Sequence, residues 1–196
     1  MKPALFALWI LSSSLLLAQT AKLEEVGKSP VEARFAPGGQ IRVELCSSGV
    51  ELRGTTENLL RVSYHSEQER TADVRVRLQT SGDEADLRVS GCPHNNFQVT
   101  IELPRSSNLR VRMFAGDLQI RDVTGDKDVV LHAGQLTMDV GDPATYSHVH
   151  ASVNTGDLEA EPFNVSKGGL FRSFERSGSG KYRLYAHVGA GELDLR

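Results

Sequence analysis

Apolar and polar residues alternate along most of this chain from Gly39 onward. A period of two places successive side chains on opposite faces of a β-strand that is buried on one face. No window of about twelve residues keeps the 3.6-residue apolar period of an amphipathic helix. The pattern therefore predicts an all-β chain of short strands. The alternating segments cover residues 41–45, 60–64, 74–78, 87–89, 97–103 and 109–113.

A short motif recurs in the second half of the chain: glycine, a polar residue, then leucine. Clear copies begin at Gly116, Gly134, Gly156 and Gly191, and a degenerate copy begins at Gly49. Glycine adopts positive φ without a Cβ clash, so we expect a strand to arrive, turn at the glycine and leave as another strand. The clear copies are 18, 22 and 35 residues apart, so the period is irregular.

Stacking such units edge to edge predicts a β-solenoid or β-helix-like stack of short strands with a narrow core over residues 35–196. A β-sandwich built from hairpins is the alternative, because a spacing of about 8–12 residues per strand suits it equally well. Residues 22–34 are charged and interrupted by Pro30, and their helix-like spacing covers only a short stretch. We expect them to form a linker.

The first segment has the pattern of a secretory signal peptide. Lys2 precedes an apolar core that is interrupted by serines at positions 12–14 and followed by small residues up to Ala21. We expect residues 1–21 to be removed on export, with cleavage after Ala18 or Ala21. An uncleaved membrane anchor is the alternative, but the serines leave apolar runs too short to span a bilayer comfortably.

Composition narrows the class of protein. Apolar residues make up 39% of the 196-residue chain and charged residues 24%, with a formal net charge of −3. These values exclude a disordered chain, a multi-span membrane protein and a basic nucleic-acid binder. All 18 glycines follow residue 21, which is typical of a chain with many turns.

Export gives the two cysteines a structural meaning, because a disulfide persists outside the reducing cytosol. Cys46 shares the polar face of its strand with Arg42 and Glu44, and Cys92 lies on the corresponding polar face of its own segment. Two thiols on equivalent faces could bridge neighbouring strands. Two free thiols are the alternative, and no Cys-His pattern indicates a catalytic thiol.

Residues 35–196 resemble the putative adhesin family of bacterial exported proteins and related auto-transporter-like head domains, whose members carry Gly-Asp-Leu/Ile repeats on a β-solenoid-like scaffold. The resemblance implies an exported β-rich surface or envelope protein and brings no catalytic residues. It rests on the four glycine motifs, on Gly39-Gln40-Ile41-Arg42-Val43 leading to Ser48-Gly49-Val50-Glu51-Leu52, on Val99-Thr100-Ile101-Glu102-Leu103, and on Gly178-Ser179-Gly180-Lys181-Tyr182.

Two sets of side chains raise the question of a metal ion. Ca²⁺ needs about six to eight oxygens and zinc three or four ligands, and neither spacing supplies them. We therefore interpret both sets as polar surface residues and predict no metal, cofactor or catalytic residue. They are Asp117, Gln135, Asp157 and Glu192, which share one position after each glycine, and the histidines His148, His150 and His132.

The sequence thus predicts a non-enzymatic, exported, adhesin-like β-repeat domain that binds or scaffolds at the bacterial cell envelope. Its partner is an unknown envelope protein or glycan, with no nucleic acid and no membrane span after signal cleavage. Its location is the periplasm, the cell surface or the medium. The outward residues expected to make contact are Arg110, Arg112, Arg183, Tyr185, His187 and a loop at residues 171–180.

Two other classes of protein remain as alternatives. One is a carbohydrate-active enzyme on a β-helix resembling pectate lyases, which needs paired carboxylates in a groove. The other is a self-assembling scaffold resembling bactofilins, in which open coils stack end to end.

Overall fold

The fold is all-β, as the alternation predicts. The computed structural model describes residues 20–46, 48–67, 71–93 and 96–196, and these contain no α-helix. The elements are β1 Thr20–Val26, β2 Val31–Arg34, β3 Gln40–Leu45, β4 Ser48–Thr55, β5 Leu59–Ser66, β6 Arg75–Ser81, β7 Glu84–Ser90, β8 Phe97–Pro104, β9 Asn108–Arg121, β10 Lys127–Met138, η1 Pro143–Thr145, β11 Tyr146–Ala160, η2 Glu161–Phe163, β12 Val165–Ser177 and β13 Tyr182–Leu195.

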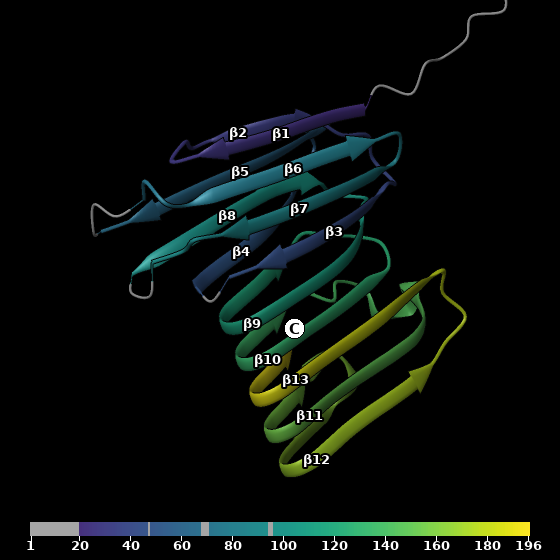
Figure 1. Cartoon of the computed structure of the whole chain (residues 1–196). Helices are drawn as coiled ribbons and strands as arrows, with labels where there is room; N and C mark the ends of the chain where they lie inside the picture. Colours follow the sequence, from purple (N-terminus) through teal and green to yellow (C-terminus); the bar gives the residue numbers. More distant parts are fainter. Residues whose placement is uncertain (1–19, 47, 68–70, 94–95) are drawn as a thin grey trace, which may run out of the picture.

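The strands form one open mixed sheet that folds into two layers (Figure 1). The first layer runs β1-β6-β7-β3 and continues through the N-terminal arms of β9, β10, β13 and β11. The second layer runs β2-β5-β8-β4 and continues through the C-terminal arms of the same long strands. The antiparallel strand β12 closes the series in both layers.

The long strands bend from one layer to the other in a stacked series (Figure 1). A column of paired glycines occupies these bends. Gly134 pairs with Gly116 on one side and with Gly191 on the other, and Gly156 pairs with Gly191 and Gly169. All five have a positive φ, between 115° and 135°. The small residues that precede the four motif glycines also pair in register, so the bends of neighbouring strands superimpose. They are Ala115, Ala133, Thr155 and Ala190.

Close approach of the backbones makes glycine necessary in this column. A Cβ atom on Gly134 would lie 2.0 Å from the carbonyl oxygen of Gly116, and one on Gly191 would lie 1.9 Å from that of Gly134. Neither contact can be relieved by rotating a side chain, because the obstructing atom belongs to the backbone. The bend therefore excludes side chains by space as well as by dihedral angle.

The order of the strands explains the irregular spacing of the glycine motif. The chain passes from β10 to β11 and β12, and then β13 inserts between β10 and β11. Gly49 departs from the expected turn position: Ser48 pairs with Gly116, and Gly49 pairs with Asp117. The chain changes layer between the end of β3 and the start of β4, before Gly49, whose φ is not positive.

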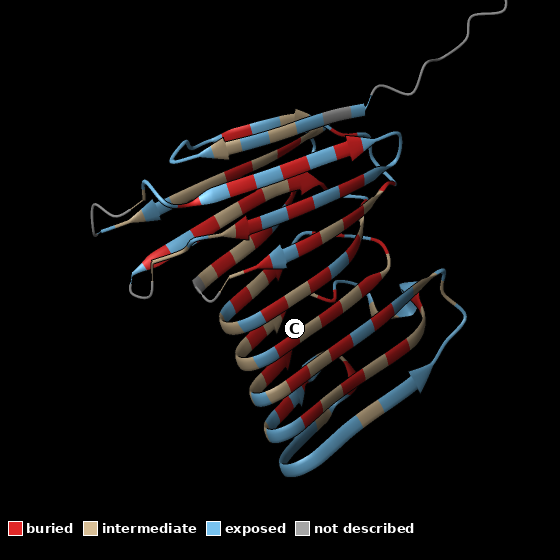
Figure 2. Cartoon of the chain, in the orientation of Figure 1, coloured by how far each residue is buried: buried red, intermediate tan, exposed pale blue. Residues whose placement is uncertain are grey.

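The core lies between the layers (Figure 2). Alternate residues of each strand enter it and are almost fully buried, while their neighbours face solvent. In the first layer Val111, Val129 and Ala186 pack side by side in register, and in the second layer Leu118 and Leu136 do so. This arrangement accounts for the regular alternation in the sequence.

Residues 22–34 are not the expected linker. They contribute to β1, which pairs with β6, and to β2, which pairs with β5. Pairing satisfies the backbone groups of β1 and β2 that face β6 and β5, and Leu23 and Val31 pack on the core. The predicted signal peptide, residues 1–21, lies outside the described residues except for Thr20 and Ala21. Among the described residues, no helix is long and apolar enough to cross a membrane.

Cys46 and Cys92 form a disulfide, with their Cα atoms 6.1 Å apart. They follow the parallel neighbours β3 and β7, so the bond joins two chain segments just beyond the point where the strands end. The closed loop spans a sequence separation of 46 residues. In the chain-entropy account, such a loop stabilises the folded state by about 4 kcal/mol.

β12 covers the far end of the stack with cationic side chains. Lys167, Arg172 and Arg176 lie opposite the buried residues Leu158, Val153 and Val149 of β11, so they share the core-facing side. Lys167 Nζ donates to the carbonyl oxygen of Ser173 at 2.7 Å, and Arg172 Nε donates to that of Gly168 at 2.8 Å. Both bonds cross the bend from one arm of β12 to the other.

These contacts protect the edge of the sheet. Gly178 N donates to Ser147 O. In an antiparallel pair, alternate residues direct their backbone N–H and C=O groups toward and away from the partner strand. Counting back from Gly178, the backbone groups of Ser173 and Glu175 therefore face away from β11. The Lys167 ammonium donates a hydrogen bond to one of these outward carbonyl oxygens, that of Ser173. Inward-facing charges also oppose the addition of an apolar strand, a common means of preventing edge-to-edge association.

Replacing Gly134 with alanine will destabilise the fold by at least about 3 kcal/mol, because both the positive φ and the 2.0 Å contact with Gly116 O become unfavourable. Gly82→Ala is the matched control. Gly82 has a φ of 61° with open space around its Cβ position, so its replacement should cost only about 1 kcal/mol. Equal losses in urea unfolding would contradict the steric account of the bend.

Replacing Lys167, Arg172 and Arg176 together with valine will cause association through β12 that increases with protein concentration, because it removes the inward charges and exposes free carbonyls. Sedimentation velocity will detect the larger species. The control carries threonine at the outward positions Ser166, Ser173 and Glu175 and should remain the size of the wild type. A monomeric valine variant would show that the charges do not control association.

Candidate binding face

The outward side chains of the first layer form one continuous face, which we call the first-layer face. Parallel register arranges them in rows across neighbouring strands. Arg42, Arg110, Asp128, Tyr185 and His150 occupy one such row on β3, β9, β10, β13 and β11. Regular strand spacing places consecutive members about 4.8 Å apart at the backbone.

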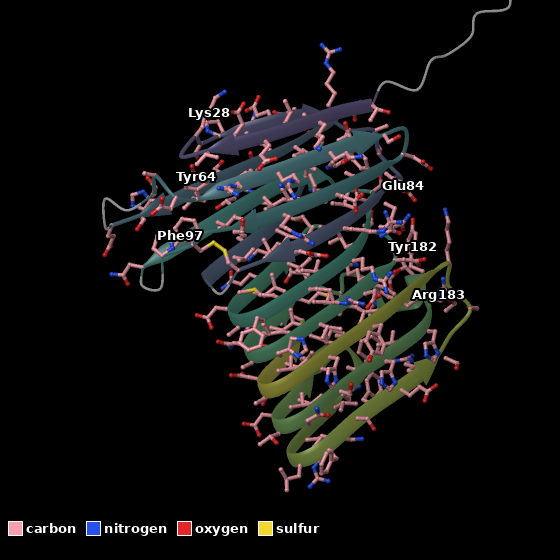
Figure 3. All side chains as sticks on the ribbon, viewed as in Figure 1. Lys28, Tyr64, Glu84, Phe97, Tyr182 and Arg183 are labelled. Atoms are coloured by element: carbon pink, nitrogen blue, oxygen red, sulfur yellow. A yellow bond between two sulfur atoms is a disulfide. The ribbon has the colours of Figure 1, made fainter. Side chains whose placement is uncertain are left out.

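A groove of about 720 Å³ lies on this face, toward the ends of the strands that are remote from the glycine bends. Figure 3 shows two of its lining residues, Glu84 and Arg183, on that side of the molecule. Four arginines and three carboxylates present charge to the groove, with Lys127 buried beneath them, although the whole chain has a net charge of −3. The lining comprises Gln40, Arg42, Glu84, Leu109, Arg110, Arg112, Asp126, Lys127, Asp128, His148, Arg183, Leu184 and Tyr185.

Asp128 holds Arg112 across the floor of the groove. Arg112 Nη2 donates to both carboxylate oxygens at 2.9 and 2.8 Å, and its Nη1 donates to the backbone oxygens of Val111 and Asp128. This bidentate geometry fixes the guanidinium against the sheet. Arg112 is therefore a rigid part of the groove, with most of its donors already used.

Three other arginines at the groove keep donors exposed. Arg110 Nε lies 3.3 Å from Asp128, and 56% of the Arg110 side chain is accessible. Arg183 is 74% accessible, and its guanidinium approaches Asp126 only to 3.8 Å. Arg42 contacts Glu84 and Asp86 at 3.2 and 3.5 Å. Contacts of this kind between exposed groups contribute little to stability, so these arginines can engage another anion.

The ring of Tyr185 forms the other wall of the groove. Tyr185 stacks on His150 with ring centroids 5.3 Å apart and planes inclined by 6°. Farther along the face, His187 Nδ1 lies 2.9 Å from Ser152 Oγ. Burial lowers the pKa of His187, and the neighbouring His132 and His150 lower it further. The face thus changes from arginines on β3 and β9 to aromatic and imidazole rings on β13 and β11.

The expected contact residues separate into three groups. Arg110, Arg112, Arg183 and Tyr185 line the same groove, and His187 lies outside the groove on the same face. Residues 171–180 are not a free loop, because most of them form the second arm of β12 and pair with β11. Their regular pairing follows from the antiparallel hairpin that closes the stack.

The polar residues after the glycines lie side by side. Gln135 pairs with Asp117 and with Glu192, and Glu192 pairs with Asp157. In the part of the chain that the structure describes, no group of three His, Cys, Asp or Glu side chains could hold a metal ion. The same holds for the three histidines considered above: His148 and His150, which face outward from β11, and His132 on β10.

Beneath the groove lies a buried lysine. Lys127 is 2% exposed, and its Nζ donates to the hydroxyl of Tyr146 at 2.6 Å; this hydroxyl donates to Val140 O at 3.1 Å. No described carboxylate forms an ion pair with the ammonium. Burial lowers the pKa of Lys127 to about 8, although Asp126 and Asp139 partly oppose the shift. Burial likewise raises the pKa of Tyr146 to about 12, with a smaller contribution from Tyr182.

Sequence reasoning overlooked Arg42, Asp128 and Lys127. A signal for Lys127 was present, because it has the same parity as Val129 and Leu131 and therefore belongs to the inward face of its strand. The position of Asp128 between Arg110 and Tyr185 had no such signal. It depends on β13 inserting beside β10, and strand order cannot be obtained from periodicity.

Comparisons with known proteins give one informative similarity. No family model matches the chain, and no curated protein matches it. A solved structure of a putative cell adhesion protein from Clostridium sporogenes aligns with a TM-score of 0.52 and 11% identity, covering 90% of this chain and 99% of that one. At this identity the similarity concerns the fold.

Replacing Lys127 with methionine will remove a rise in the free energy of unfolding between about pH 8 and 10.5. In that interval the unfolded lysine keeps its proton while the folded one has lost it, so the wild type gains up to about 3 kcal/mol as pH rises. Urea unfolding across this range provides the measurement. The exposed control Lys22→Met should retain the rise, and an unchanged rise in Lys127→Met would refute the assignment.

Proposed function

We propose that this chain is a non-enzymatic, exported, adhesin-like domain that uses the groove on the first-layer face to bind a partner at the bacterial cell envelope. The observation that carries the proposal is the groove itself. Exposed arginine donors and a stacked aromatic pair meet on a rigid sheet whose backbone groups are already paired. Such a surface recognises a ligand through side chains and needs no conformational change of the scaffold.

Several features support export and an adhesive role. The first residues have the composition of a signal peptide, and the Cys46–Cys92 disulfide is compatible with an oxidising compartment. We interpret the parallel run of bent strands β9, β10, β13 and β11 as a short β-solenoid-like stack that continues the hairpin-built part of each layer. The solved structure with a similar fold is described as a putative cell adhesion protein, and we extend that role to this chain.

The alternatives receive less support. A glycoside-cleaving enzyme needs two carboxylates available for acid and base chemistry. In the groove, Asp128 is held by Arg112, Glu84 by Arg42, and Asp126 accepts a hydrogen bond from the backbone of Arg183. A scaffold that stacks end to end is disfavoured by the inward charges of β12.

The test begins with the chain expressed behind its own first residues in a bacterial host. We expect a processed, disulfide-bonded protein in the periplasmic fraction, where it can be purified. Its labelled form should bind isolated cell envelopes saturably. The double variant Arg110→Glu, Arg183→Glu should bind at least about tenfold more weakly, because it reverses the charge of two exposed groove donors.

The control for this experiment is Arg34→Glu, Arg121→Glu, which makes the same change of charge in the second layer. It should bind envelopes like the wild type. Equal losses in both variants would indicate a general charge effect and would overturn the assignment of the site. An absence of saturable binding by the wild type would overturn the binding function.

A further inference from the structure

We propose that the groove binds a polysaccharide whose sugar rings carry carboxylate or sulfate groups. This inference rests on the proposed function and specifies the chemistry of the partner. It follows from the shape of the groove, the free ring face of Tyr185, and the excess of arginine donors.

The shape follows from one short side chain between two long ones. Arg110 and Tyr185 both pair with Asp128, which lies on the strand between them. At two strand spacings, their backbones are separated by roughly 10 Å. Because Asp128 is short and turned toward the arginines, it leaves a depression with Tyr185 on one side and Arg110 on the other.

The tyrosine supplies an apolar surface of the kind that sugar rings use. His150 covers the ring face directed toward β11, as the parallel stacking requires. The opposite face is directed toward β10, and Tyr185 remains 41% exposed. The C–H groups of a sugar can pack on this face, while His150 holds the ring upright from behind.

The guanidinium groups supply the anion contact. Among the described carboxylates, only Asp128 lies within ion-pair distance of Arg110, and it contacts the Nε atom. The two Nη groups of Arg110 therefore remain available for a planar carboxylate or a sulfate. Arg183 offers a second exposed guanidinium at the same groove, so successive charged sugars of one chain can be contacted.

The same geometry disfavours an extended acidic peptide. Peptides commonly bind sheets by adding a strand to an exposed edge. The groove lies over β9, β10 and β13, each of which has a hydrogen-bonded neighbour on both sides. No backbone edge is accessible there, and recognition by ring stacking together with anion contacts fits a charged sugar better.

The test is calorimetric titration of the periplasmically purified protein with four polymers. Heparin supplies sulfated sugars, polygalacturonate supplies carboxylated sugars, dextran is a neutral polysaccharide, and polyglutamate is an acidic peptide. We expect measurable binding of heparin, polygalacturonate or both, and at least about tenfold weaker binding of dextran and polyglutamate. The two charged polysaccharides distinguish sulfate from carboxylate recognition.

Variants identify the contacts. Arg110→Gln and Tyr185→Ala should each weaken binding about tenfold, and Tyr185→Phe should restore it relative to Tyr185→Ala because the ring is kept. Arg121→Gln, in the second layer, should bind like the wild type. All three positions are on the surface, and thermal unfolding will verify that each of the four variants is folded.

Three results would overturn the proposal: no binding of either charged polysaccharide, dextran binding of equal strength, or polyglutamate binding of equal strength with no effect of Tyr185→Ala. Envelope binding separates this failure from that of the proposed function. If envelopes still bind through Arg110 and Arg183 while both polysaccharides fail, the binding function stands and the sugar assignment is wrong. If the assignment is right, the active polysaccharide will also displace the protein from envelopes.

Discussion

The close approach of backbones at the glycine bends is the constraint on which the rest of the structure depends. At Gly134, Gly156 and Gly191 a long strand crosses from one layer to the other where a Cβ atom would meet the carbonyl oxygen of a neighbouring strand. Once the bends superimpose, both arms of every strand are in register with their neighbours. The two-layer core and the rows of outward side chains are consequences of that register.

Register also explains how a surface of ordinary polar residues becomes a groove. A row contains one residue from each strand, so the lengths of those side chains determine where the surface is raised and where it is hollow. Asp128 is a short member between Arg110 and Tyr185, and its carboxylate is held down by Arg112. The rigid sheet holds this hollow in a fixed shape, so a ligand can bind without reorganisation of the protein.

Much of the fold could be predicted because it follows from local rules. Alternation located the strands, and the preference of a bend for glycine located Gly116, Gly134, Gly156 and Gly191. Gly169 was missed because the antiparallel strand β12 carries Gly168 and Lys167 opposite Asp157 and Leu158, so the motif is absent there. The insertion of β13 between β10 and β11, the pairing of β1 with β6 and that of β2 with β5 depend on contacts between distant segments, which local patterns do not encode. The groove could not be predicted for the same reason: its two walls become neighbours only through the position of β13.

The distribution of cationic groups separates structural from binding roles. On β12, Lys167 and Arg172 face the end of the core and donate to carbonyl oxygens of their own strand, so their charge protects an edge. Lys127 is buried beside a tyrosine hydroxyl, where its charge opposes folding at neutral pH. Arg110 and Arg183 instead face outward over paired strands and retain exposed donors. Because neither the edge nor the core requires their charge, recognition of an external anion is the role that best accounts for them.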